Sequence, residues 1–321
     1  MKNPMNPAIE TKGLVKRFGK VTAVDGLSLR VERGEIYAFL GLNGAGKTTT
    51  IRMLLGMIRP TAGEAYVLGN KIARGQKKPW ASVGYLVETA GAYPELTVRQ
   101  NLEAMRRLRP GVEPEAVTRI IEQLGLTAYA DRRAGALSHG NAQRLGVAKA
   151  MLHKPELLIL DEPANGLDPA GIVEIRHLLR RLADDQGVAI FISSHILGEV
   201  TRLADRVGII HEGRLLQELS RAELEGQRRR WLHIQVRQPL AAQRALAAAG
   251  YSAAMDNGAL PRAGLHLVDE RALARPEQIA TLLVQSGNPP AMLAVEQEEL
   301  EQYFLRLVGP DQVAQGREVE A

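Results

Sequence analysis

The sequence predicts an α/β fold, with a parallel sheet in its larger part and a small α+β module at its C-terminal end. An apolar run, a glycine-rich loop and a helical pattern follow one another over residues 36–58, in the order strand, loop, helix. Further apolar strands at 83–87, 157–160 and 188–193 alternate with helical segments. This alternation is typical of a parallel sheet, whose functional site lies at the carboxyl ends of the strands.

The composition is that of a folded protein with room for about two domains. The chain has 321 residues, of which 45% are hydrophobic and 24% are charged. It contains no cysteine, which excludes disulfides and cysteine-ligated metals. No apolar run approaches the roughly 18 residues of a membrane-spanning helix, and the N-terminus has no hydrophobic signal core. The net charge of +5 could suit nucleic acid or an anionic membrane surface, but most Lys and Arg are scattered, which favours a solvated surface, and no nucleic-acid partner is expected.

The loop after the strand at 36–40 satisfies the phosphate-loop pattern G-x-x-x-x-G-K-[ST]. The candidate nucleotide-binding residues are Gly41, Leu42, Asn43, Gly44, Ala45, Gly46, Lys47, Thr48 and Thr49. Glycines permit the tight turn, and the backbone N–H groups at the helix N-terminus form an anion site. Lys47 supplies a positive charge to the β- and γ-phosphates, and the Thr48 hydroxyl is a candidate Mg²⁺ ligand. These residues predict a nucleotide site.

Two acidic residues directly follow the apolar strand at 157–160. Asp161 is a candidate Mg²⁺ ligand, and Glu162 is placed to orient or deprotonate a water that attacks the γ-phosphate. An Asp–Glu pair at a strand end is also compatible with a helix cap. The phosphate loop alone leaves kinases, GTPases and many ATPases open, and the second acid favours hydrolysis over transfer. A GTPase is disfavoured because residues 70–73, Asn-Lys-Ile-Ala, lack the aspartate that reads guanine.

The remaining elements divide the chain into a main domain at 8–228 and a C-terminal module at 231–308. Before the loop, strands near 9–14 and at 27–31 predict an antiparallel sheet. Residues 95–153 predict a helical subdomain. Its first helix begins at a capping box over Thr97–Gln100, its second at Pro114, and its third has Ser138 as N-cap.

The C-terminal module has its own pattern of strands and helices. The order is β-α-β-β-α-β, which suggests a ferredoxin-like fold. The tail at 309–321 is polar.

Three further segments occur in a fixed order around the acidic pair. Residues 137–144 read Leu-Ser-His-Gly-Asn-Ala-Gln-Arg, residues 166–168 read Gly-Leu-Asp, and His195 follows a strand. Together with the phosphate loop and Asp161–Glu162, they resemble the signature, D-loop and switch histidine of the ATP-binding subunits of ABC transporters. The resemblance covers roughly residues 8–225.

The resemblance implies a role for each matching residue. Phe18 is in the place of the aromatic residue that stacks on adenine. The signature residues Ser138, His139, Gly140 and Asn141 are expected to face the ATP of a second subunit, with Ser138 and Gly140 contacting its γ-phosphate. Asp168 is expected to couple the two sites. His195 is expected to hold the γ-phosphate together with Glu162, which makes these two the catalytic residues.

The chain departs from the family pattern at three kinds of position. His139 and Asn141 replace the usual Gly and Gln of L-S-G-G-Q. Phe18 replaces the commoner Tyr and keeps the ring that stacking needs. Glu88 stands in the place of a loop Gln and is a third candidate metal ligand. An acid there, and the segment 300–304, resemble the bacterial branch that serves bacitracin resistance and lantibiotic immunity.

The function implied by this resemblance is that of an ATPase subunit of a bacterial exporter. Two copies of the chain would sandwich two ATP molecules with Mg²⁺ and drive a separately encoded integral-membrane permease. The cargo would be a drug, a peptide or a lipid-like compound, and the chain would lie peripherally at the cytoplasmic face of the inner (plasma) membrane. The alternative is a soluble ABC ATPase acting as a regulatory or ribosome- or nucleic-acid-associated switch. For the C-terminal module, metabolite sensing and a dimer-stabilising or packing role are both open.

Overall fold

The structure is a computed structural model that describes residues 6–73, 79–87, 91–195, 198, 202–255 and 264–309. The described residues divide into two compact units, 6–222 and 223–309. Each unit has a hydrophobic cluster of its own. Within the described ranges, no helix combines the length and apolar character that crossing a bilayer requires.

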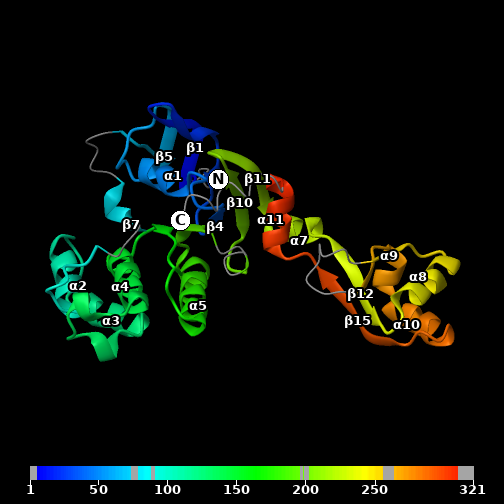
Figure 1. The fold of residues 1–321 in the computed structure, drawn as a ribbon. Helices are drawn as coiled ribbons and strands as arrows, with labels where there is room; N and C mark the ends of the chain where they lie inside the picture. Colours follow the sequence, from blue (N-terminus) through cyan, green and yellow to red (C-terminus); the bar gives the residue numbers. More distant parts are fainter. Residues whose placement is uncertain are drawn as a thin grey trace, which may run out of the picture. The chain divides into compact units, whose positions relative to one another are not determined.

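The first unit contains a six-stranded sheet with the strand order β11-β10-β4-β9-β8-β7 (Figure 1). The strands are β4 (Ile36–Leu40), β7 (Val83–Leu86), β8 (Leu157–Asp161), β9 (Ala189–Ser194), β10 (Arg206–His211) and β11 (Arg214–Ser220). Every neighbouring pair is parallel except the β10–β11 pair. The predicted parallel sheet is therefore confirmed. Leu40 pairs with Ser194, and Asp161 with Ser193, so the carboxyl ends of β4, β9 and β8 lie side by side.

A second, antiparallel sheet has the order β2-β1-β5-β6, with β3 also paired to β1. Its strands are β1 (Ile9–Phe18), β2 (Val21–Leu27), β3 (Arg30–Val31), β5 (Ala62–Val67) and β6 (Asn70–Lys71). The prediction of one continuous strand over 27–31 is wrong. The Thr11 hydroxyl donates to the Leu27 carbonyl and accepts from the Leu29 N–H, so a side chain interrupts the regular ladder here, although the Thr11 N–H still donates to the Leu29 carbonyl.

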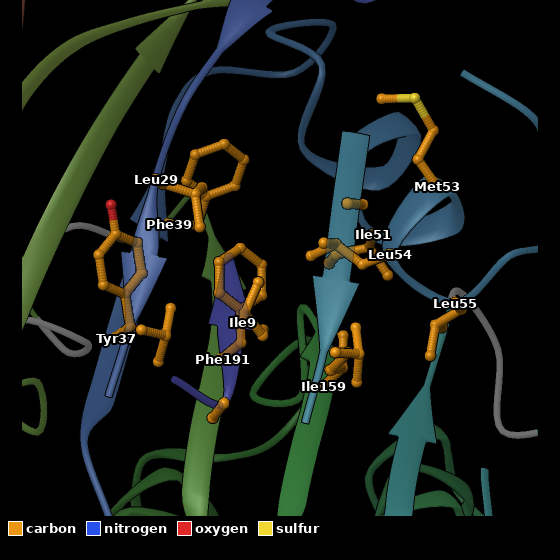
Figure 2. Close-up of a cluster of buried hydrophobic side chains, with 14 of the residues drawn as sticks. Ile9, Leu29, Tyr37, Phe39, Ile51, Met53, Leu54, Leu55, Ile159 and Phe191 are labelled. Atoms are coloured by element: carbon orange, nitrogen blue, oxygen red, sulfur yellow. The ribbon is translucent and has the colours of Figure 1, made fainter. Parts of the chain in front are cut away.

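The core of the first unit lies between these two sheets. Figure 2 shows Phe39, Phe191 and Ile159 of the parallel sheet in one cluster with Ile51 and Leu54 of helix α1 (Lys47–Leu54). All five are fully buried. Burial of each such side chain contributes about 1.5–3 kcal/mol. Because α1 begins at the end of the glycine loop, its packing also fixes the direction in which the loop faces.

The first three α-helices after β7 begin at the predicted positions Thr97, Pro114 and Ser138. The described helices of this part are α2 (Val98–Arg107), α3 (Glu115–Gln123), α4 (His139–Met151) and α5 (Pro169–Gln186), with short 3₁₀ turns at Trp80–Ser82, Thr127–Tyr129 and Ala134–Ala136. Thr97 and Gln100 form the predicted capping box of α2. Ser138 caps α4 by accepting a hydrogen bond from the Asn141 N–H. Helices α2, α3 and α4 pack against one another, and α4 also packs on β7.

The second unit has a four-stranded antiparallel sheet with the order β13-β14-β12-β15. Its elements are α7 (Arg221–Gln227), β12 (Arg230–Val236), α8 (Pro239–Ala248), β13 (Ala253–Met255), β14 (Leu265–Leu267), α9 (Glu270–Ala274), α10 (Pro276–Gln285), β15 (Pro290–Gln297) and α11 (Leu300–Val308). Leu232 and Leu265 of the sheet pack with Leu246 of α8 and Leu283 of α10. This is the predicted ferredoxin-like arrangement, with an additional short helix α9.

The separate cores predict that the first unit folds without the second. A chain truncated after Ala222 is expected to keep a cooperative thermal transition and to bind ATP, because its hydrophobic cluster is formed within the unit. Calorimetry and titration with a fluorescent ATP analogue measure both properties. A chain ending after Gly187, which lacks the internal strand β9, serves as the unfolded control. A gradual, non-cooperative melt of the longer fragment would contradict independence.

Candidate active site

The glycine loop connects the end of β4 to the start of α1 and forms the floor of a hollow of about 220 Å³. The hollow is lined by Ala23, Asn43, Gly44, Ala45, Gly46, Lys47, Thr48, Thr49 and Glu162. Gly46 has φ +105°, and a Cβ atom there would lie 2.4 Å from the Ala23 carbonyl oxygen. Gly41 is equally confined, since a Cβ would lie 2.5 Å from the Ile210 carbonyl oxygen. The loop can therefore adopt this shape only with glycine at these two positions.

Replacement of Gly46 by alanine is expected to weaken ATP binding about tenfold or more. The new methyl group meets backbone that cannot move without displacing β2, and the left-handed φ adds roughly 1 kcal/mol of strain. Gly26→Ala is the matched control, because Gly26 also has positive φ, a Cβ there would meet nothing within 4 Å, and Gly26 does not line the hollow. Equilibrium titration with a fluorescent ATP analogue compares them. Equal affinities of the two variants would show that the contact with Ala23 is unimportant.

Lys47 lies at the floor of the hollow and is 6% exposed. Its ammonium group donates to the carbonyl oxygens of Gly41, at 2.8 Å, and Leu42, at 3.3 Å. It also lies 3.4 Å from Oε1 of Glu162. A buried cation held by neutral carbonyls and one carboxylate is suited to receive the negative charge of a phosphate group.

Thr48 and Asp161 bring two oxygen ligands together at the edge of the loop. The Thr48 hydroxyl donates to Oδ2 of Asp161 at 2.8 Å, and the Ser193 hydroxyl donates to Oδ1 at 2.5 Å. Asp161 is almost fully buried, at 2% exposure. A hydroxyl and a carboxylate oxygen in contact fit the preference of Mg²⁺ for oxygen ligands beside a nucleotide phosphate. Ser193 was not among the sequence candidates, because no motif marks a serine within that strand.

Glu162 and His195 form a pair at the ends of β8 and β9. Oε2 of Glu162 lies 2.7 Å from Nδ1 of His195 and 3.3 Å from its backbone nitrogen. The Glu162 N–H donates to the Ser193 hydroxyl oxygen at 3.1 Å. The Glu162 side chain is 22% and that of His195 39% exposed, so both remain accessible to a ligand in the hollow.

The signature residues lie at the start of α4, and the D-loop residues precede α5. Ser138 is the α4 N-cap, and the His139 ring packs so closely on Gly166 that a Cβ there would lie 1.8 Å from it. Asp168 caps α5, accepting from the Gly171 N–H at 3.0 Å. The helix-cap alternative for the Asp161–Glu162 pair is not what the structure shows, since Asp161 accepts from Thr48 and Ser193 and Glu162 contacts Lys47 and His195. Ser138, His139, Gly140, Asn141 and Asp168 are not among the residues that line the described hollow.

Phe18 ends β1 and is 49% exposed, with the Lys16 ammonium 4.8 Å from the centre of its ring. It too is outside the set of residues that line the hollow. Glu88, the third candidate metal ligand, lies outside the described residues.

A phosphate loop after an internal parallel strand, a Thr–Asp oxygen pair and a Glu–His pair define a P-loop nucleotide hydrolase.

Residues 24–165 match the family model of the ABC transporter. The bacitracin transport ATP-binding protein BcrA of Bacillus licheniformis is 40% identical over 95% of this chain and 98% of its own length. The lantibiotic transport ATP-binding protein SrtF of Streptococcus pyogenes is 35% identical over 65% of this chain and 90% of its own. A solved ATP-binding subunit of an ABC transporter covers 68% of this chain and 92% of its own, with 29% identity and a TM-score of 0.63.

The chain belongs to the family of ABC transporter ATP-binding subunits. Its predicted similarity to the bacitracin and lantibiotic branch is confirmed. Because the similarity to BcrA extends over almost the whole chain, it includes the C-terminal unit.

Proposed function

We propose that two copies of this ATPase close around two ATP molecules with Mg²⁺ and drive a separate membrane permease that exports a drug, a peptide or a lipid-like compound. The observation that carries the proposal is the position of the Glu162 carboxylate. It lies at the hollow over the phosphate loop, between the Lys47 ammonium and the His195 ring.

The chemistry assigned to this chain is hydrolysis of the γ-phosphate bond of ATP. Lys47 and the loop N–H groups bind the β- and γ-phosphates. Thr48 and Asp161 would hold Mg²⁺, which neutralises phosphate charge when bound, and Glu88 would add a third ligand. Glu162 orients and deprotonates the attacking water, and His195 holds both Glu162 and the γ-phosphate in place.

A second copy of the chain completes the site. Residues 138–141, which the structure describes, do not line the hollow over the phosphate loop of their own chain. Ser138 lies at an exposed helix N-terminus, where free N–H groups favour an anion. We propose that this N-terminus, together with His139, Gly140 and Asn141, contacts the ATP that is bound by the partner copy. Asp168 links the two sites, and Phe18 stacks on the adenine ring.

The membrane partner is proposed from the relatives. Two of them are described as transport ATP-binding proteins for bacitracin and for a lantibiotic. We therefore place the chain at the cytoplasmic face of the membrane, bound to a permease.

Purification of the full chain from detergent-solubilised membranes of its own cells tests this proposal. We expect an integral-membrane protein with several spans to co-purify with it in a defined ratio. If the chain is found wholly in the cytosolic fraction, bound to ribosomes or to no membrane protein, the transporter assignment fails. The alternative, a soluble ABC ATPase with a regulatory role, would then be favoured.

A further inference from the structure

Gln143 is a buried residue in the second turn of α4 that contacts the catalytic segment of its own chain. It is 4% exposed, and its side-chain amide Nε2 donates to the Glu162 carbonyl oxygen at 3.0 Å. The two residues are nineteen positions apart, and they belong to different elements, since α4 precedes β8. A buried amide is costly to leave without a partner, so this contact holds both groups in place.

The peptide that Gln143 contacts has an unusual conformation. Glu162 has φ +50°, the left-handed region that non-glycine residues rarely adopt. Such a conformation persists only where the surroundings enforce it. The Glu162 N–H is directed at the Ser193 hydroxyl and carbonyl oxygens, at 3.1 and 3.3 Å. Its carbonyl accepts from the Asn165 N–H, at 3.0 Å, and from Gln143.

Of the three described residues that make these contacts, Ser193 belongs to the parallel sheet and Asn165 to the turn after β8, whereas Gln143 comes from α4. The start of α4 also touches this turn further along, where the His139 ring lies against Gly166 and leaves no space for a Cβ. Helix α4 is therefore a lateral support of the whole segment from Glu162 to Gly166. A displacement of α4 relative to the sheet would therefore reach the Glu162 carbonyl through Gln143.

We propose that Gln143 is a positioning residue for ATP hydrolysis, which fixes the Glu162 peptide and so aims the Glu162 carboxylate at the hollow over the phosphate loop. The inference rests on the proposed role of Glu162 as the base. It also connects the two sites of the dimer. Gln143 is five residues from Ser138, about 7.5 Å along the helix axis. Helix α4 thus links Ser138, which is proposed to contact the partner's ATP, with Gln143, which contacts Glu162 of its own site.

The test uses two substitutions in the full chain. Gln143→Met keeps the length and bulk of the side chain but removes the N–H donor. Gln143→Glu keeps the shape and directs carboxylate oxygens at the Glu162 carbonyl oxygen, which repels them. Gln123→Met, at the exposed end of α3, is the matched control. For each variant the measurements are kcat, KM for ATP, affinity for a fluorescent ATP analogue, and the melting temperature.

We expect Gln143→Met to lower kcat about tenfold, which corresponds to the net loss of one hydrogen bond, and to leave KM within about twofold. Gln143→Glu should lower kcat further, and Gln123→Met should behave as the parent. In a Glu162→Gln background, Gln143→Met should lower the residual rate no further, because the side chain that it aims has already lost its basicity.

The outcomes separate this inference from the proposed function. If Glu162→Gln abolishes hydrolysis while both Gln143 variants keep the parental kcat, the positioning role alone is wrong. If Glu162→Gln keeps the parental rate, the assignment of the base is wrong and the inference falls with it. If kcat, KM and melting temperature change together in both Gln143 variants, Gln143 is only structural. If the Gln143→Met chain does not fold, the Gln143→Glu variant decides between these results, because it keeps a polar side chain of the same size.

Discussion

Replacement of Glu162 by glutamine is expected to lower the rate of ATP hydrolysis by about a hundredfold or more while ATP still binds. The amide keeps the size of the side chain and one oxygen near the His195 ring, but it cannot accept a proton from water. General-base catalysis contributes on the order of 10²- to 10⁴-fold to such a reaction. Binding survives because Lys47 and the loop N–H groups are unchanged. The removal of the carboxylate even takes a negative charge away from the phosphate site.

The measurement is steady-state phosphate release together with titration of a fluorescent ATP analogue. Glu156→Gln is the matched control, since Glu156 precedes the same strand but forms a surface ion pair with Arg33. That control should hydrolyse ATP at the parental rate, because an exposed ion pair contributes little. A Glu162→Gln protein with most of its activity would overturn the assignment of Glu162 as the base.

Replacement of Lys47 by alanine is expected to weaken ATP binding about a hundredfold or more. The ammonium group is buried at the floor of the hollow, and it is the charge that balances Glu162 there before nucleotide binds. Removal of one partner of the buried charge pair that Lys47 would form with the phosphates costs about 2–5 kcal/mol of binding free energy. The carboxylate of Glu162 would also face the phosphates without an intervening cation.

Isothermal titration with ATP and Mg²⁺ measures this effect. Lys12→Ala is the control, because Lys12 is exposed on β1, where its ammonium group pairs with Glu10 and lies over the Tyr66 ring, away from the hollow lining. Parental affinity in the Lys47→Ala protein would show that the phosphates bind elsewhere. An intermediate loss in Lys47→Arg would show that charge and the exact length of the side chain both matter.

Much of this site could be predicted because its residues follow one another closely in the chain. The phosphate loop requires a fixed spacing of glycines, lysine and threonine within one strand–loop–helix unit, and the structure has that unit. The caps at Thr97 and Ser138 are also local, since each hydroxyl reaches an N–H three residues later. Such patterns are readable from the sequence without knowledge of the packing.

The contacts that support the site could not be predicted in the same way. Gln143 meets Glu162, and Ser193 meets Asp161, only because α4, β8 and β9 are brought together by the packed sheet. A buried Gln within a helix carries no signal of the carbonyl that it will contact. The division of the strand over 27–31 has the same origin, because Thr11 reaches it from another strand. Long-range hydrogen bonds follow from tertiary structure, which overrides the local alternation of apolar residues.

The most direct test of the account is the mass of the Glu162→Gln chain with and without ATP and Mg²⁺. Light scattering after size-exclusion chromatography should show a chain of 35.0 kDa without nucleotide and twice that mass with it. Chemical analysis of the larger species should find two ATP molecules per two chains, because in the proposed sandwich each phosphate loop faces the signature of the other copy. A chain that binds ATP and keeps the mass of one copy at concentrations far above its ATP dissociation constant would contradict the proposed sandwich.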